Sequence, residues 1–266
     1  MSSKENLLIE GSELNLIFIH GWGMNSGVWR SFQPFLDSLD IPKGITANCH
    51  FLDLPGYGNS KHVSLDHYNL AALSEHVESL LPTNTLLIGW SLGGLVATAI
   101  ALSASQKVVG LINLCSSPKF MQEGNWPGIK PDVIAAFESQ LVGEYAQLMK
   151  RFVGIQFMGV ESQRTNSKEV LNNILDYPAP DKEVLAAGLE ILKNTDFRER
   201  LGKLDIPQLN IFGRLDSLVP IKVVDEIQQL SALSCHQVIA KASHAPFISH
   251  PQEVLKAING FITESL

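Results

Sequence analysis

The sequence predicts an α/β fold: a mostly parallel sheet with helices on both faces and a helical segment inserted into the chain. The first observation is that short apolar runs alternate with longer amphipathic stretches, as in successive βαβ units. The second is that this alternation stops at residue 116, gives way to helical periodicity until about residue 188, and then resumes. We therefore expect residues 1–117 and 189–266 to form one core and residues 118–188 to form a helical lid.

The predicted strands are short apolar runs bounded by turn residues. In chain order they cover residues 14–20, 48–54, 85–90, 108–115, 208–213 and 236–240. Apolar residues at helical spacing predict helices at residues 28–39, 65–81, 92–103, 221–230 and 251–261. In the inserted segment the same spacing predicts helices at residues 133–141, 145–157, 167–175 and 182–192, and no strand. Pro118, Pro127 and Pro131 mark the beginning of that segment.

Composition narrows the possible functions. The chain has 266 residues, 45% of them hydrophobic, which is enough for one large domain. Its formal net charge is −7, whereas a surface that follows nucleic-acid phosphates should be basic. Nucleic-acid binding is therefore not expected.

No segment predicts a membrane span or a secreted protein. The longest nearly apolar run, residues 94–104, has about half the length of a spanning helix. The apolar stretch at residues 7–9 is too short for a secretory signal. The three cysteines, Cys49, Cys115 and Cys235, are far apart and odd in number, so we interpret them as reduced thiols of a cytoplasmic protein.

The most informative motif is Gly89-Trp90-Ser91-Leu92-Gly93, a G-x-S-x-G between a predicted strand and a predicted helix. A serine at the tip of so tight a turn projects its hydroxyl into open space. Glycines at both −2 and +2 remove the Cβ atoms that would collide as the backbone folds back. We interpret Ser91 as a nucleophile; the alternative is an ordinary serine at the beginning of a helix.

A serine nucleophile needs a base, and the base needs an orienting acid. Among eight histidines, His244 lies four residues after the last predicted strand, at the carboxyl edge of the sheet. His250 precedes Pro251, and we expect it to cap or start the last helix. Asp216 follows Gly213, at the end of a strand, by three residues, whereas Asp205 precedes that strand and Asp225 lies in the next helix. The order Ser91, Asp216, His244 is that of the α/β-hydrolases.

The oxyanion of a tetrahedral intermediate needs hydrogen-bond donors. We expect one to be the backbone N–H of Leu92, directly after the nucleophile, and the other to be that of Trp22, in the loop after the first strand. His20, at the end of that strand, is better interpreted as a buried histidine that fixes the loop by hydrogen bonding than as a catalytic group.

Other motifs are incomplete. The run from Gly21 to Ser26 resembles a dinucleotide-binding loop, but a serine stands where the third glycine belongs. No Walker A motif, HExxH motif or paired Cys/His spacing occurs. The chemistry predicted here requires no metal and no cofactor.

Several segments together resemble the pimeloyl-[acyl-carrier protein] methyl ester esterases of biotin synthesis, within the α/β-hydrolase superfamily. They are HGWGMNSGVW, DLPGYGNS, IGWSLGGLVA, SSPKF, WPGIKPDV, GLEILK, GRLDSLVP and KASHAPFISHP, between about Leu16 and Pro251. The resemblance implies an α/β-hydrolase fold, a Ser91–Asp216–His244 triad, and hydrolysis of a carrier-bound pimeloyl methyl ester to methanol and a free carboxylate.

The resemblance also implies binding residues. Substrate contacts are expected at Trp22, Ser91, Leu92, His244 and the lid residues Phe152, Val153, Gly154, Ile155 and Gln156. An acidic carrier protein is expected to dock on Arg151, Arg164 and Lys168; Gln147 replaces a basic residue expected there. Residues 147–170 contain four basic and two acidic side chains, a local charge of +2. The alternative to a docking role is that these basic side chains belong to an ordinary solvated face of the lid. Separately, we expect the chain to act as a monomer.

Other functions stay open at this point. A broad short-chain carboxylesterase would use the same triad without a carrier protein. A C–C bond hydrolase is less favoured by the lid segments, and a haloalkane dehalogenase would need a carboxylate in place of Ser91. A fold of this kind can also serve as a ligand receptor that catalyses nothing.

Overall fold

The computed structural model of the protein describes residues 11–231 and 233–266. Within them six strands form one parallel sheet in the order β2-β1-β3-β4-β5-β6. The strands are β1 (Glu13–Ile19), β2 (Thr46–Leu52), β3 (Thr85–Trp90), β4 (Val108–Leu114), β5 (Gln208–Gly213) and β6 (Ser234–Ile239). The α/β class and all six predicted strands are confirmed, each strand within two residues at either end.

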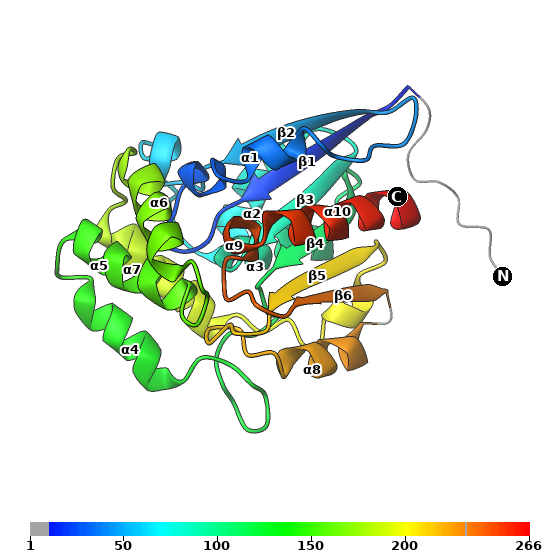
Figure 1. The fold of residues 1–266 in the computed structure, drawn as a ribbon. Coiled ribbons are helices and arrows are strands. Elements are labelled where there is room, and N and C mark those ends of the chain that lie inside the picture. Colours follow the sequence, from blue (N-terminus) through cyan, green and yellow to red (C-terminus); the bar gives the residue numbers. More distant parts are fainter. Residues whose placement is uncertain (1–10, 232) are drawn as a thin grey trace.

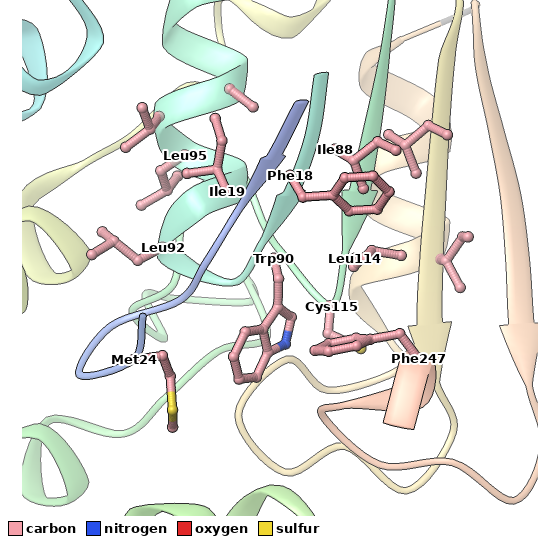
Figure 2. Packing of buried hydrophobic residues seen from close by; sticks show 14 of the residues in the cluster. Phe18, Ile19, Met24, Ile88, Trp90, Leu92, Leu95, Leu114, Cys115 and Phe247 are labelled. Atoms are coloured by element: carbon pink, nitrogen blue, oxygen red, sulfur yellow. The ribbon is translucent and has the colours of Figure 1, made fainter. Parts of the chain in front are cut away.

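The central strands are buried on both faces because both faces are covered. Every residue of β3 and of β5 is buried, whereas the edge strands β2 and β6 each contain exposed positions. Figure 2 shows part of this core, with Phe18, Ile88 and Leu114 contributed by neighbouring strands. Strand β3 ends at Trp90, which pairs with Leu114 at the end of β4. The residues after these two strands therefore emerge side by side at one edge of the sheet.

Helices cover the two faces of the sheet. Figure 1 shows α3 (Leu92–Leu102) behind the strands together with α2 (Leu70–Leu80), and α10 (Pro251–Ser265) in front of them. Helix α8 (Val223–Leu230) lies beside β6. The remaining short helices of the core are η1 (Ser26–Trp29), α1 (Gln33–Leu36), η2 (Gly58–Ser60), η3 (Leu201–Lys203) and α9 (Pro246–Ser249). No helix in the described ranges is long and apolar enough to cross a bilayer.

Four helices lie between β4 and β5 and gather beyond one end of the sheet (Figure 1). They are α4 (Pro131–Gln140), α5 (Tyr145–Gln156), α6 (Gln163–Leu175) and α7 (Lys182–Asn194), close to the four predicted lid helices. The described part of this segment contains isolated bridges but no strand. The predicted boundary between residues 188 and 189 falls inside α7, and residues 1–10 of the predicted core lie outside the described residues. The division into core and lid stays a prediction.

The helix predicted at residues 28–39 is wrong as a single element. The chain forms the 3-10 turn η1 and then the one-turn helix α1. The Asn25 side chain accepts a hydrogen bond from the N–H of Gly27 and caps η1, which begins at Ser26, two residues before the predicted start. Pro34 lies in the first turn of α1, so a new helix begins there. A proline removes a hydrogen-bond donor inside a helix, so the apolar spacing alone could not maintain one continuous helix.

The helix predicted at residues 65–81 begins five residues later, at Leu70. Asn69 has extended backbone angles, and its side-chain oxygen accepts a hydrogen bond from the N–H of Ala72 at 3.0 Å. This cap satisfies one of the amides that a helix leaves without a partner. The start of α2 is thus set by a cap that the apolar pattern did not reveal.

Candidate active site

Ser91 lies at a strained turn between β3 and α3. Its backbone angles are φ 54° and ψ −117°, in a region that residues other than glycine rarely adopt. A Cβ at position 89 would lie 2.4 Å from the oxygen of Gly93, and one at position 93 would lie 2.3 Å from the oxygen of Ile19. The predicted requirement for both glycines is confirmed, because no side chain fits at either position.

The backbone of Ser91 is held on both sides. Its N–H donates to the oxygen of Leu114 at 3.0 Å, and its carbonyl accepts from the hydroxyl of Ser116 at 2.8 Å. Both partners belong to β4 or to the loop after it. The turn is thereby fixed from the neighbouring strand, so the strain at Ser91 is supported by its surroundings.

Asp216 lies in the loop after β5 with a fully buried carboxylate. Oδ1 accepts hydrogen bonds from the N–H groups of Leu218 at 2.8 Å and Val219 at 3.0 Å. Oδ2 accepts from Nδ1 of His244 at 2.7 Å. A carboxylate that accepts from three donors has little freedom to turn, so its direction toward the imidazole is fixed.

His244 lies in the loop after β6, and its ring is buried. Its N–H donates to the oxygen of Gln156 at 3.0 Å, and its carbonyl accepts from the indole Nε1 of Trp90 at 2.8 Å. Since Nδ1 donates to Asp216, the neutral ring carries its lone pair on Nε2. Nε2 is buried and has no hydrogen-bond partner among the described residues, Ser91 included, so it is available to accept a proton.

The structure thus brings Asp216 and His244 into direct contact and anchors the His244 loop on Trp90, the neighbour of Ser91. Catalytic hydrogen bonds are often made only once a substrate is bound, so the absence of a bond from Ser91 in this state is compatible with a relay.

His250 is placed at the N-cap of α10, as expected, although its side chain makes no capping hydrogen bond.

A small cavity lies above Ser91 at the carboxyl end of the sheet. It measures about 20 Å³ and, Ser91 apart, is lined by apolar side chains: Trp22, Phe120, Ile129, Ile134, Phe137, Phe152, Leu189, Leu192 and Leu218. Three of these come from α4 and α5, and two from α7. That volume holds about one water molecule, so an acyl chain can enter only if some of these side chains or helices shift.

The predicted lid contacts are distributed over two environments. Phe152 lines the cavity and packs edge-on against the Trp22 ring, with centroids 5.0 Å apart. Val153, Gly154, Ile155 and Gln156 do not line it. Gln156 is nevertheless close to the site, because its backbone oxygen binds His244 and its buried side-chain amide has no partner in the described chain.

The loop after β1 carries the predicted second oxyanion donor. His20 donates from Nδ1 to the oxygen of Gly21 at 2.8 Å, and its Nε2 accepts from the N–H of Leu54 at 3.1 Å. Burial lowers the pKa of His20, which keeps the ring neutral, as this pair of bonds requires. His20 therefore fixes the loop, as predicted. Across residues 11–231 and 233–266, the backbone N–H of Trp22 has no acceptor.

The N–H of Leu92 is the other predicted donor. Leu92 is the first residue of α3, and first-turn amides have no acceptor within their own helix. The positive end of the helix dipole lies at the same place. This environment suits a developing negative charge beside Ser91.

Cys115 lies beside Asp216 and His244, a position that the sequence analysis did not predict. Its sulfur and the ligand atoms of Asp216 and His244 lie within 4.8 Å of one another. Burial, and then the charge of Asp216, raises the pKa of the Cys115 thiol well above its usual value, so the thiol stays protonated. A cation held by these three residues would have to break the 2.7 Å bond between Asp216 and His244, so the set fits proton transfer better than metal binding.

The three predicted docking residues do not line one groove. Arg164 and Lys168, on α6, line a groove of about 760 Å³ together with Lys150 of α5. Arg151 lies outside that groove; its guanidinium donates to the side chain of Gln140 at 3.1 Å. Lys150 was counted in the local charge but not named for docking, whereas it lines the same groove as Arg164 and Lys168. Which residues of a helix share a groove depends on how the helix packs, and the docking assignment stays a prediction.

Comparisons with known proteins agree with this geometry. A family model described as the alpha/beta hydrolase fold matches residues 15–251. The chain is 41% identical over 256 residues to a protein of Photobacterium profundum named pimeloyl-[acyl-carrier protein] methyl ester esterase, covering 95% of this chain and 96% of that protein. It is 42% identical over 252 residues to the protein of the same name from Aeromonas hydrophila, with the same coverage.

Solved structures share the fold. An esterase from Exiguobacterium antarcticum superposes with a TM-score of 0.81 at 21% identity, covering 96% of this chain and 93% of that one. A bromoperoxidase from Bacillus anthracis superposes with a TM-score of 0.79 at 21% identity, covering 96% and 94%. At this identity the likeness concerns the fold alone.

Proposed function

Since the chain belongs to the α/β-hydrolase family and, within it, to the pimeloyl-[acyl-carrier protein] methyl ester esterases, we propose that it hydrolyses the methyl ester of pimeloyl-[acyl-carrier protein] to the free carboxylate and methanol. This reaction serves biotin synthesis. As a member of the family the chain is a carboxylic ester hydrolase. The mechanism that follows assigns this reaction to the residues described above.

In the first step the hydroxyl of Ser91 attacks the ester carbonyl while Nε2 of His244 takes its proton. Asp216 holds the imidazole in the tautomer that leaves Nε2 free to accept. The N–H groups of Leu92 and Trp22 stabilise the oxyanion of the tetrahedral intermediate. His244 then returns its proton to the departing methoxide, which leaves as methanol, and an acyl-enzyme remains on Ser91.

In the second step a water molecule takes the place of the Ser91 hydroxyl. His244 removes a proton from it as it attacks the acyl-enzyme, and the proton passes to Ser91 as the carboxylic acid is released. What carries this assignment is the buried 2.7 Å bond between Asp216 and His244, at the sheet edge from which Ser91 also emerges.

The cavity lining supports an aliphatic substrate. Its walls contain no charged side chain, so a methylene chain with an uncharged ester end suits it better than a carboxylate does. The product carries a new carboxylate beside these apolar walls, which favours its release. The other end of the acyl chain must leave the cavity, because it is attached to a carrier protein.

The carrier protein would dock on the groove between α5 and α6. Its lining includes the exposed side chains of Lys150, Arg164 and Lys168, against one acidic residue, Glu161, and the apolar side chains of Leu171 and Leu175. A basic rim attracts an acidic partner and orients it. We extend the proposal to a monomer acting in the cytoplasm, with residues 118–188 as the lid.

The test compares two substrates. The rate constant kcat/KM is measured for pimeloyl methyl ester attached to an acyl-carrier protein and for a small butyryl ester. Preference for the carrier-bound ester, with methanol as a product, supports the proposal. Equal or better turnover of the small ester would instead indicate a broad short-chain carboxylesterase.

A further inference from the structure

Two helices of the inserted segment hold the loop that carries the proposed oxyanion donor. Tyr145, the first residue of α5, donates from its hydroxyl to the backbone oxygen of Gly23 at 2.8 Å. The indole Nε1 of Trp22 donates to the backbone oxygen of Leu185, in α7, at 2.8 Å. Two consecutive residues of the loop are thereby bonded to two different helices.

Helix α5 also reaches the loop of the proposed base. Gln156, its last residue, accepts through its backbone oxygen the hydrogen bond from the N–H of His244. The helix begins at a residue bonded to the oxyanion loop and ends at one bonded to the His244 loop. A single rigid element therefore fixes the spacing between the two.

The fit between this loop and the helices is tight. A Cβ at Gly23, where φ is +71°, would lie 2.7 Å from Cε of Met149 in α5. A Cβ at Gly188, in α7, would lie 2.7 Å from Cδ1 of the Trp22 ring. Close packing on both sides leaves the loop little room to move unless a helix moves with it.

The chemistry of Tyr145 suits a fixed donor. Burial raises the pKa of its phenol, so the hydroxyl stays protonated and donates. The Gly23 carbonyl that it binds is one residue from the Trp22 amide, so rotation of this short stretch would change the direction of that N–H. The hydroxyl of Tyr145 touches no reacting atom, and its influence acts through the backbone.

We propose that Tyr145 and the Trp22 indole are positioning groups that set the direction of the Trp22 backbone N–H, so that the inserted helices determine whether the oxyanion donor is in place. The inference rests on the proposed esterase function. It goes further in assigning to the helical segment a part in transition-state stabilisation, beside any part in covering the substrate.

The test is Tyr145→Phe, assayed with a small methyl ester and with the corresponding thionoester. Misplacement of one donor should lower kcat for the oxygen ester about tenfold and leave KM unchanged, because the donor acts on the transition state. Sulfur accepts hydrogen bonds weakly, so the ratio of oxygen-ester to thionoester rates should also fall. A purely structural role of Tyr145 would leave that ratio as in the parent protein.

Tyr68→Phe is the matched control, because it deletes another half-buried hydroxyl that donates to a backbone oxygen, that of Pro55, at 3.0 Å. It should keep the parent kcat and the parent ratio. Gly188→Ala is an independent second variant that displaces the indole and should lower the ratio with Tyr145 intact. Unchanged ratios in both Tyr145→Phe and Gly188→Ala overturn the inference, whereas an inactive parent protein overturns the esterase function itself.

Discussion

The indole nitrogen of Trp90 lies 2.8 Å from the backbone oxygen of His244 and donates a hydrogen bond to it, across 154 residues of sequence. Trp90 is the last residue of β3 and directly precedes Ser91. Its ring also packs edge-on against Phe247, with centroids 5.2 Å apart, and Figure 2 shows both rings near Cys115 beyond the strand ends. The residue before the proposed nucleophile thus holds the loop of the proposed base.

Replacing Ser91 by alanine should lower esterase turnover by about 10³-fold or more, because no other hydroxyl replaces the nucleophile. The thermal unfolding midpoint should stay close to that of the parent, since the backbone bonds to Leu114 and Ser116 remain. Ser79→Ala, on the exposed side of α2, is the matched control and should keep full turnover. Near-parental activity of Ser91→Ala would refute the assignment of the nucleophile.

Replacing Gly93 by alanine should destabilise the fold by at least about 2 kcal/mol, because the new methyl group would lie 2.3 Å from the oxygen of Ile19. Gly260→Ala, in α10, is the matched control: apart from its chain neighbours and the backbone of its own helix, no atom of a described residue lies within 4 Å of its added Cβ. That variant should gain about 0.5–1 kcal/mol from helix propensity. Urea denaturation measures both, and equal stability of the two variants would contradict the steric conflict between a side chain at position 93 and the oxygen of Ile19.

Acidification should weaken the fold through His20. Burial lowers its pKa in the folded state below the value of about 6.5 expected in the unfolded chain. The folded state then binds fewer protons, so the stabilisation is complete above about pH 6.5 and is lost as pH falls toward the folded pKa. Burial also lowers the pKa of His236, which adds a loss in the same direction.

The free energy of unfolding should therefore decrease between about pH 7 and pH 5, as urea denaturation at several pH values would show. His20→Gln should make this dependence shallower, whatever its effect on absolute stability. His67→Gln, at an exposed position, should keep the parent slope. Identical slopes in all three proteins would mean that His20 is not the group that takes up the proton.

Reversing the charges of Arg164 and Lys168 together, to glutamate, should lower kcat/KM for the carrier-bound ester about tenfold, and less so at high salt. The small ester should be unaffected. Arg151→Glu should cause a smaller loss, because Arg151 lies outside the groove that the other two line. Equal losses on both substrates would mean that these side chains do not act by docking a carrier.

The nucleophile turn was predictable because its constraints are local. Gly89, Ser91 and Gly93 are close in sequence, and steric exclusion within one turn requires the two glycines wherever that turn occurs. Asp216 and His244 could be selected by a simple rule of topology, since residues that follow parallel strands meet at the same edge of the sheet. Local geometry and strand order together were enough to predict the turn at Ser91 and the contact between Asp216 and His244, whereas their catalytic roles stay a prediction.

The contacts around them were not predictable in this way. Nothing in the sequence near Tyr145 indicates that its hydroxyl would reach Gly23, and the side of α5 on which Arg151 lies depends on how that helix packs. The break between η1 and α1 likewise followed from an asparagine cap and a proline that outweighed an apolar repeat.

By itself, then, the sequence determined the α/β fold, the strained serine turn and the chain order of the proposed acid and base. The tertiary structure decided which nitrogen of His244 has no hydrogen-bond partner among the described residues, how small the cavity above Ser91 is, and which helices bind the Trp22 loop. The physical reason is that steric and strand-order rules act over short stretches or along a regular sheet. Hydrogen bonds and cavities between distant segments, in contrast, exist only after those segments have packed together.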